Sequence, residues 1–167
     1  MALYGGTGDL KTVKKQQLNT IISKAEGMCA HSGSRLTDKR KHILELLLVS
    51  NTPLSAYDVA DKYNKTAEAT MPAMSVYRIL DFLASEQLVH KLSSANKYVA
   101  CSHITCAHAH DVPQFLICSK CQNVKEIAVA KNIIDELAHQ VADAGYKLLN
   151  APLELQCICA DCQASAA

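Results

Sequence analysis

Apolar residues in the first half of the chain recur every three or four positions, which is the spacing of helices that bury one face. The pattern predicts four helices, over residues 15–28, 37–52, 55–63 and 73–83. In the third, Ser55 and Asp58 resemble the capping box that begins many helices. Two short alternating segments follow, 88–92 and 97–100, with a polar turn between them. Helices followed by a two-stranded hairpin indicate a winged helix-turn-helix.

The second half of the chain shows shorter alternation around one helix. Its apolar residues predict four strands, over residues 115–117, 124–127, 146–149 and 153–156. A helical stripe over 129–142 separates the second strand from the third, and Gly145 is its expected stop. A unit of about 70 residues has a limited core and usually needs an additional staple. The predicted fold is therefore α+β, with a winged helix-turn-helix over 1–95, a hinge over 96–100 and a small α/β domain over 101–167.

Composition excludes several classes of protein. The 167 residues are 49% hydrophobic and 20% charged, with a formal net charge of +1, as in folded globular chains. No apolar run approaches the ~18 residues that cross a bilayer, and the first residues lack the features of a secretory signal. We therefore expect a reducing, cytoplasmic location and no membrane partner. Because disulfides are uncommon there, the eight cysteines and seven histidines favour metal binding.

Charge and cysteine are unevenly distributed along the chain. Residues 1–95 carry a formal charge of +3 and one cysteine, Cys29, whereas the remainder carries −2 and the other seven cysteines. The charge difference is too small to establish nucleic-acid binding. The cysteine distribution is more informative, and it indicates two domains with separate roles.

The second half contains two Cys-x-x-Cys knuckles, Cys118 with Cys121 and Cys159 with Cys162. Two thiolates in a tight turn chelate one ion, and two knuckles complete a tetrahedral four-sulfur zinc site. The 37 residues between the knuckles exceed the ~15–20 of a simple zinc ribbon, but the predicted strand–helix–strand unit fits there. Reduced core cysteines and a redox Cys-x-x-Cys are the alternatives. A four-thiolate site is coordinatively full, so its expected role is structural.

A second group of potential ligands lies upstream and offers several donor types. Its members are His90, Cys101, His103, Cys106, His108, His110 and Glu126. One thiolate, two imidazoles and one carboxylate would hold zinc in a site more exchangeable than four thiolates, as a sensor requires. Taken singly, His103 and Cys106 also fit an ordinary polar loop. Composition alone does not choose among these ligands.

Polar side chains in the helical half could contact duplex DNA. An arginine on a recognition helix reads guanine, and basic residues elsewhere hold phosphates. The candidates are Tyr57, Ser75, Tyr77, Arg78, Arg35, Lys39, Arg40 and Lys41. For residues 39–41, a solvated helix start is the alternative interpretation.

These motifs together resemble the ferric uptake regulator superfamily, and most closely its zinc uptake regulator branch. The similarity runs from about Ile21 to Cys162. The segments that carry it are 35–40, 55–58, 75–83, 88–91, 115–121 and 159–162. The resemblance implies a zinc-loaded homodimer that represses transcription by binding palindromic operator DNA of zinc-uptake genes. It also implies a C-terminal dimerisation domain.

The resemblance assigns roles to particular residues. The four knuckle cysteines match the family's structural zinc, and Tyr57 and Arg78 match its base-contacting positions. His90, Cys101, Glu126 and one histidine match its regulatory site, giving about two Zn²⁺ per protomer. We prefer His110 for that histidine, with His108 as the alternative. The loop after Cys101 departs from the family's usual histidine-rich run, so His103 and Cys106 also compete for this position.

The ligand types in the predicted regulatory site bear on which metal it binds. A thiolate in the sensing site favours Zn²⁺ over Fe²⁺ or Mn²⁺, although a regulator of another metal is the alternative. A metal held by ligands from both domains would fix the relative orientation of the two DNA-binding domains of a dimer.

Two other functions are alternatives. A zinc hydrolase with Glu126 as general base would need an open coordination position, and the chain has no His-Glu-x-x-His motif. A zinc-stapled module that binds only protein is the other hypothesis. Zinc-dependent, salt-sensitive binding to duplex DNA would separate these hypotheses, and the expected answer is a regulator without enzymatic activity.

Overall fold

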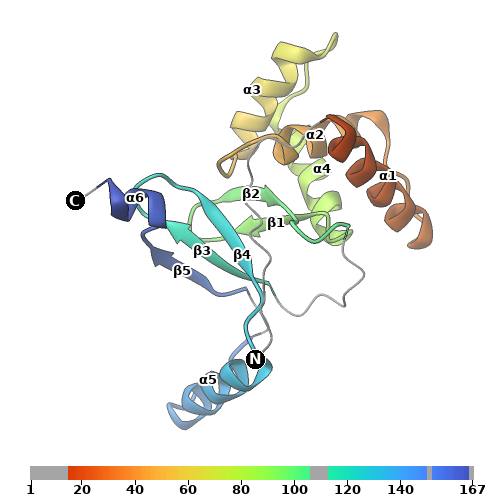
Figure 1. Cartoon of the computed structure of the whole chain (residues 1–167). Helices are drawn as coiled ribbons and strands as arrows, with labels where there is room; N and C mark the ends of the chain where they lie inside the picture. Colours follow the sequence, from red (N-terminus) through yellow and green to blue (C-terminus); the bar gives the residue numbers. More distant parts are fainter. Residues whose placement is uncertain (1–14, 106–112, 150–151, 166–167) are drawn as a thin grey trace. The chain divides into compact units, whose positions relative to one another are not determined.

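The computed structural model describes residues 15–105, 113–149 and 152–165, and the chain divides after residue 107 into two compact units (Figure 1). The elements of the first unit are α1 (Lys15–His31), α2 (Asp38–Leu48), α3 (Ala56–Thr66), α4 (Ala73–Ser85), β1 (Val89–Leu92) and β2 (Lys97–Ala100). Those of the second unit are β3 (Gln114–Cys118), β4 (Val124–Ile127), α5 (Lys131–Asp143), β5 (Glu154–Cys157) and α6 (Ala160–Ala164). The predicted α+β class is confirmed. Across the described residues, no helix is both long and apolar enough to cross a membrane.

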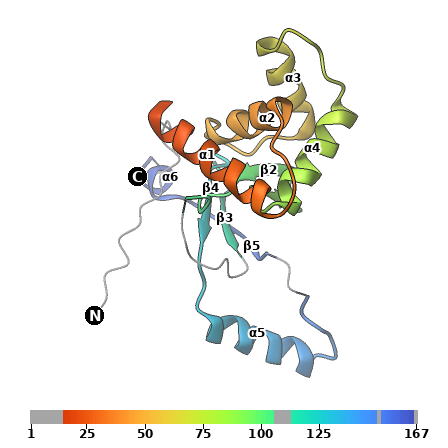
Figure 2. The same cartoon turned by 90° about the vertical axis from the view of Figure 1, so that its right-hand side faces the viewer.

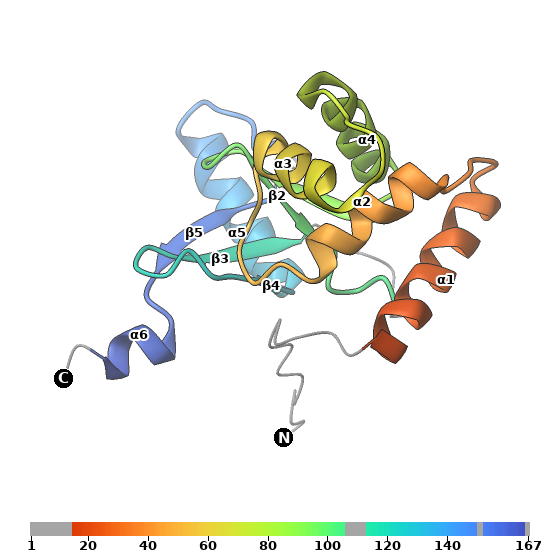
Figure 3. The same ribbon diagram turned by 90° about the horizontal axis from the view of Figure 1, so that it is seen from above.

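The core of the first unit forms where the apolar faces of its helices meet. Helices α2, α3 and α4 pack on one another, and α1 packs on α2 (Figure 3). The largest fully buried side chains of this core include Ile43, Leu44, Val59, Val76, Leu80, Leu83 and Leu88. Except for Leu88, which precedes β1, these residues belong to the apolar stripes of the helices, so burial of those stripes accounts for the helical arrangement.

The β1–β2 hairpin completes the winged helix-turn-helix. The two strands pair antiparallel, and a backbone bridge joins β2 to the connection between α2 and α3. In that bridge the Tyr98 and Leu54 N–H groups each donate to the other's carbonyl, at 2.8 and 3.0 Å. Residues 97–100, which we expected to form both the second strand of the hairpin and part of a hinge over 96–100, form strand β2 of the first unit. The reason is burial: Tyr98 and Ala100 lie in the core, and Cys101 and Ile104 extend that core beyond the strand.

Two helix starts of the first unit differ in their caps. The Ser55 hydroxyl accepts from the Asp58 N–H at 3.1 Å, and the Asp58 carboxylate accepts from the Ser55 N–H at 2.9 Å. This is the reciprocal capping box predicted for α3. Thr37 is the N-cap of α2, but its side chain makes no capping hydrogen bond.

Ser55→Ala is expected to lower the free energy of unfolding by about 1 kcal/mol at neutral pH, because it removes a capping bond. Thr37→Ala is the matched control, since that hydroxyl caps nothing, and its effect should be clearly smaller. The Ser55 hydroxyl and N–H hold the pKa of Asp58 below its ordinary value of 3.8. The stabilisation by the Asp58 carboxylate is therefore present above pH 3.8 and is lost as the pH falls through the lowered pKa. Chemical unfolding of both variants and of Asp58→Asn against pH measures this, and equal losses for Ser55→Ala and Thr37→Ala would contradict the capping role.

The second unit is a three-stranded sheet with the order β4–β3–β5. Strand β3 pairs antiparallel with β4 and parallel with β5, and the connection from β4 to β5 contains α5. Both side views show α5 beyond the ends of the strands rather than on a face of the sheet (Figures 1 and 2). No residue of α5 is buried, and Ile133 is 57% exposed. The helix thus presents an apolar stripe that the described part of its own unit does not bury.

The strand predicted over 146–149 is wrong. The helix α5 ends at Asp143; Gly145 follows the C-cap residue Ala144 with φ +83°, and the Tyr146 N–H donates back to the Val141 carbonyl at 3.0 Å. The chain then continues without regular structure, with Tyr146 75% and Leu149 72% exposed. Apolar composition alone suggested a strand here, but the segment pairs with no strand in the described residues. Gly145 as helix stop is confirmed.

Candidate metal centres and nucleic-acid interface

The topology of the second unit brings the two knuckles together. Parallel strands β3 and β5 are neighbours whose last residues, Cys118 and Cys157, pair in register. The first knuckle turns directly after β3, where the Gln122 N–H donates to the Cys118 carbonyl at 2.9 Å. The Ser119 N–H donates across to the Cys157 carbonyl at 2.9 Å, which ties this turn to the chain just before the second knuckle. Residues far apart in sequence therefore meet where strands β3 and β5 end.

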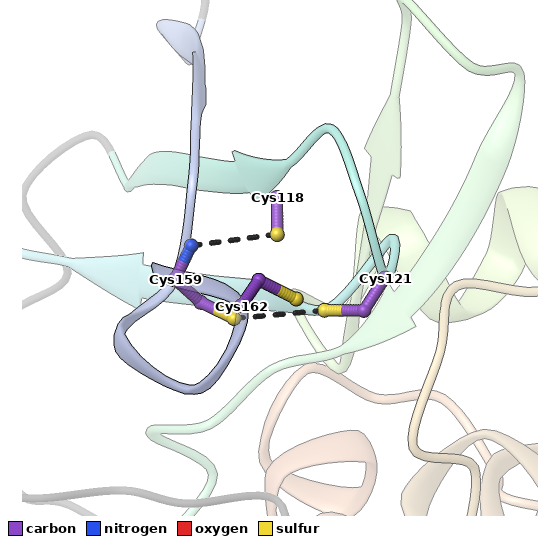
Figure 4. Close-up of side chains that lie close together, drawn as sticks. All are labelled: Cys118, Cys121, Cys159 and Cys162. Carbon is purple, nitrogen blue, oxygen red and sulfur yellow. Dashed lines mark hydrogen bonds between the residues drawn. The ribbon is translucent and has the colours of Figure 1, made fainter. Parts of the chain in front are cut away.

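The four knuckle sulfurs form a compact cluster that fits zinc. The Sγ atoms of Cys118, Cys121, Cys159 and Cys162 all lie within 4.8 Å of one another, and their side chains point to a common centre (Figure 4). The Cys121 and Cys159 sulfurs are 3.7 Å apart. Four sulfurs about 2.3 Å from a tetrahedral zinc would lie about 3.8 Å from each other. Disulfides are absent among the described cysteines. The predicted four-sulfur site therefore has the donors and spacing of a structural zinc site.

Backbone and sulfur neighbours set the ionisation of this cluster. The N–H groups of Cys121 and Cys159 hydrogen-bond the Cys118 sulfur and lower the pKa of that thiol to about 6. The adjacent sulfurs of Cys159 and Cys121 raise the pKa of Cys162 to about 12. One thiolate thus forms readily, while ionisation of Cys162 is opposed mainly by its hydrogen bonds to the neighbouring sulfurs. A divalent cation removes that opposition, so the cluster is chemically suited to binding a metal with release of protons.

The first unit brings together two of the predicted regulatory ligands. His90 lies half-buried in β1, and Cys101 follows β2 with 3% of its surface exposed. A ring nitrogen of His90 and the Cys101 sulfur lie within 4.8 Å of each other. The Cys101 N–H donates to the Leu88 carbonyl at 2.9 Å, and the Cys101 sulfur accepts from the His103 N–H at 3.4 Å. The hairpin thus holds both donors on well-packed backbone.

The remaining candidate ligands belong to other parts of the chain. Glu126 is half-buried on β4 of the second unit, opposite Phe115 of β3. Cys106, His108 and His110 lie outside the described residues. The choice among these donors and His103 therefore stays a prediction.

The predicted base-contacting residues gather on a solvent-facing side of α3 and α4. Tyr57, the second residue of α3, is 65% exposed, and Arg78 of α4 is exposed. The rings of Tyr57 and Tyr77 meet edge to face with their centroids 6.3 Å apart. Ser75 is half-buried in the first turn of α4. Side chains from two helices thus form one surface.

The predicted phosphate contacts have different structural surroundings. Arg35 and Lys39 are exposed at the start of α2. The Arg40 guanidinium lies 3.4 Å from the centroid of the Phe82 ring and donates to the Arg35 carbonyl at 2.6 Å. Lys41 pairs with Glu26 of α1 at 2.8 Å. Arg40 and Lys41 therefore contribute to packing between helices, whereas Arg35 and Lys39 point into solvent.

Two residues of this region were not predicted from the sequence. The Asn64 side chain donates to the Met71 carbonyl at 3.2 Å and accepts from the Met71 N–H at 2.6 Å, which holds the loop before α4. Met74, in the first turn of α4, is 67% exposed. The signal for Met74 is its place four residues before Arg78, on the polar side of an amphipathic helix.

Comparison with known proteins places the chain in a family. Residues 31–156 match the model of the ferric uptake regulator family. The chain is 33% identical over 150 residues to the zinc uptake regulation protein of Escherichia coli K12, covering 90% of this chain and 85% of that protein. The solved structure of a zinc uptake regulator complexed with zinc and DNA has a TM-score of 0.77 at 31% identity, over 92% of this chain and 100% of that one. The structure of holo XcZur has a TM-score of 0.71 at 32% identity, over 87% and 99% of the respective chains. The chain therefore belongs to the ferric uptake regulator family.

Proposed function

We propose that this chain is a zinc-responsive transcriptional repressor of the zinc uptake regulator branch, which binds operator DNA of zinc-uptake genes. The observation that carries the proposal is its likeness, over nearly all of both chains, to a regulator solved with zinc and DNA. The exposed Tyr57 and Arg78, together with the half-buried Tyr77, supply a surface for duplex DNA on α3 and α4. Members of this family are transcription regulators, so the chain is not an enzyme.

We place two zinc ions on each protomer with different roles. The four-cysteine cluster holds the structural ion, and His90, Cys101, Glu126 and His110 hold the regulatory one. The compact sulfur cluster supports the first assignment, and the proximity of His90 to Cys101 supports the second. A tetrahedral mixed-ligand zinc, when bound, supplies four bonds to donors that belong to two domains.

The ligand placement suggests how zinc controls DNA binding. His90 and Cys101 belong to the DNA-binding unit, whereas Glu126 belongs to a strand of the other unit. Donors shared between the units restrict their relative pose. A dimer whose two DNA-binding domains are held in a fixed relative orientation binds a palindrome more tightly than a dimer whose DNA-binding domains are loosely tethered.

A homodimer in the cytoplasm is the assembly we propose. Helix α5 carries an apolar stripe, including Ile133, of which the described part of the chain buries no residue. A second copy of the same unit would cover this stripe, as expected of a dimerisation domain.

Binding to duplex DNA as a function of free zinc tests the proposed function. The full chain is incubated with a random duplex library at buffered high zinc, and the bound sequences are enriched. We expect a palindromic consensus whose affinity falls when zinc is buffered low and when salt is raised. Enrichment of no sequence, or equal affinity at high and low zinc, would overturn the proposal in favour of a protein-binding module.

Losing His108 and His110 together should abolish zinc-activated DNA binding at zinc levels that saturate the wild type. The tetrahedral ion has one vacancy after His90, Cys101 and Glu126 have bound, so nearby donors compete for a single position. His110→Ala alone should raise the zinc requirement, whereas His103→Ala should resemble the wild type. Zinc-buffered anisotropy with metal analysis measures this, and an unchanged zinc response in the double variant would move the ligand to His103 or Cys106.

A further inference from the structure

The solvent-facing surface of α3 and α4 carries a large apolar side chain, Met74, in addition to the polar residues predicted to contact DNA. Met74 is the second residue of α4 and is 67% exposed. It precedes Tyr77 by three residues and Arg78 by four, so the three side chains share one side of the helix. Tyr57 joins them through its edge contact with Tyr77. We refer to these four residues as the α3–α4 face.

The exposed apolar side chains of the first unit are concentrated on the α3–α4 face. A single exposed apolar residue is ordinary in folded proteins. In the described part of the first unit, however, the exposed large apolar side chains are Val49, Tyr57 and Met74, and two of the three lie on the α3–α4 face. The opposite side of α4 is already occupied by core residues. Met74 therefore gains from burial only when an apolar group arrives from outside the chain.

We propose that Met74 determines specificity by contacting a thymine methyl group in the operator, next to the base that Arg78 reads. The inference rests on the proposed DNA binding. The N-terminal residues of a recognition helix are those that approach base edges in the major groove. The thymine 5-methyl is the apolar group displayed there, and the unbranched thioether of methionine adapts to its position.

The expected effect follows from the burial of one methyl group. Removing that methyl should weaken binding about fourfold when it is done in one half-site. On a palindrome bound by a dimer, removal from both half-sites should weaken binding by roughly fifteenfold, because distant contacts add. The neighbouring hydrogen bonds of the base pair are unchanged by this substitution.

Deoxyuridine scanning tests the proposal with the full, zinc-loaded chain. Each thymine of the operator selected from the random library is replaced in turn by deoxyuridine, which lacks only the methyl group. Competition anisotropy then compares the wild type with Met74→Ala and with the control Val49→Ala, whose exposed apolar residue lies at the end of α2. Because Met74 is exposed, its replacement by alanine should leave the fold intact, which circular dichroism checks.

The outcomes separate this inference from the proposed function. We expect one thymine per half-site at which the wild type and Val49→Ala lose about fourfold and Met74→Ala loses nothing. Zinc-dependent operator binding with no methyl-sensitive thymine, or with sensitivity that persists in Met74→Ala, would overturn the role of Met74 alone. Failure of the wild type to bind any duplex would overturn both proposals.

Discussion

Cys118→Ser is expected to release the structural zinc and to unfold the second unit while the first unit stays folded. The described part of the second unit buries few side chains, namely Gln114, Phe115, Ile117, Cys118 and Val124. A core of this size gives little stability unless a bound metal or a cross-link stabilises it further. Zinc binding to such sites contributes on the order of 10–16 kcal/mol at neutral pH, and this binding energy is folding energy. The first unit has its own core and does not depend on these sulfurs.

Cys157→Ser is the matched control for this experiment. Cys157 pairs in register with Cys118, but its thiol donates to the Ile117 carbonyl at 3.6 Å and lies outside the sulfur cluster. We expect this variant to keep its zinc, its fold and its dimer. Zinc content after mild chelation, hydrogen exchange of both units and sizing chromatography provide the measurements. A Cys118→Ser protein with the zinc content and protection of the wild type would refute the structural zinc site.

Arg78→Ala is expected to reduce operator affinity by about 1–3 kcal/mol and to relax discrimination at one base position. Arg78 is exposed on α4, where a guanidinium can bind guanine through two hydrogen bonds. Lys39→Ala should instead weaken binding to all duplexes alike and reduce the salt slope by about 1, because phosphate contacts carry no sequence information. Lys39 suits this comparison because it is exposed, whereas Arg40 stacks on Phe82.

Competition binding with operator and scrambled duplexes at several salt concentrations distinguishes the two roles. Arg78→Ala should lose affinity mainly for the operator, and Lys39→Ala for both duplexes. Equal losses on operator and scrambled DNA for Arg78→Ala would contradict its assignment as a base contact.

Much of the fold was predictable because burial in this chain follows simple periodicity. The four helices, the hairpin and the Ser55–Asp58 box all appear as predicted. The strand over 146–149 failed because apolar residues there remain exposed instead of joining the sheet. The alternation over 97–100 predicted the strand β2 but not its bridge to Leu54 or the full burial of Tyr98, because both depend on how the hairpin packs on the helices.

Of the two candidate metal sites, the four-cysteine cluster could be predicted from the sequence, whereas the complete ligand set of the regulatory site could not. Spacing within the two knuckles identified four sulfurs correctly as one cluster, since each pair is local and the intervening unit joins the pairs. The regulatory ligands are not determined in this way, because several donors in one loop satisfy the same chemistry. The Asn64 bonds to Met71 depend on how α3 and the loop before α4 are placed, so no local pattern predicts them, whereas the spacing of Met74 from Arg78 was a signal that the sequence analysis did not use.

A zinc-buffered titration of operator affinity with parallel zinc counting tests the central claim most directly. For the wild type, we expect operator affinity to rise at least tenfold as zinc increases from about one to about two ions per protomer. Cys101→Ser should remain a folded dimer with one zinc and should show no such rise. An operator affinity independent of zinc, or a full rise in Cys101→Ser, would contradict the proposal that zinc binding at a second, mixed-ligand site controls DNA recognition.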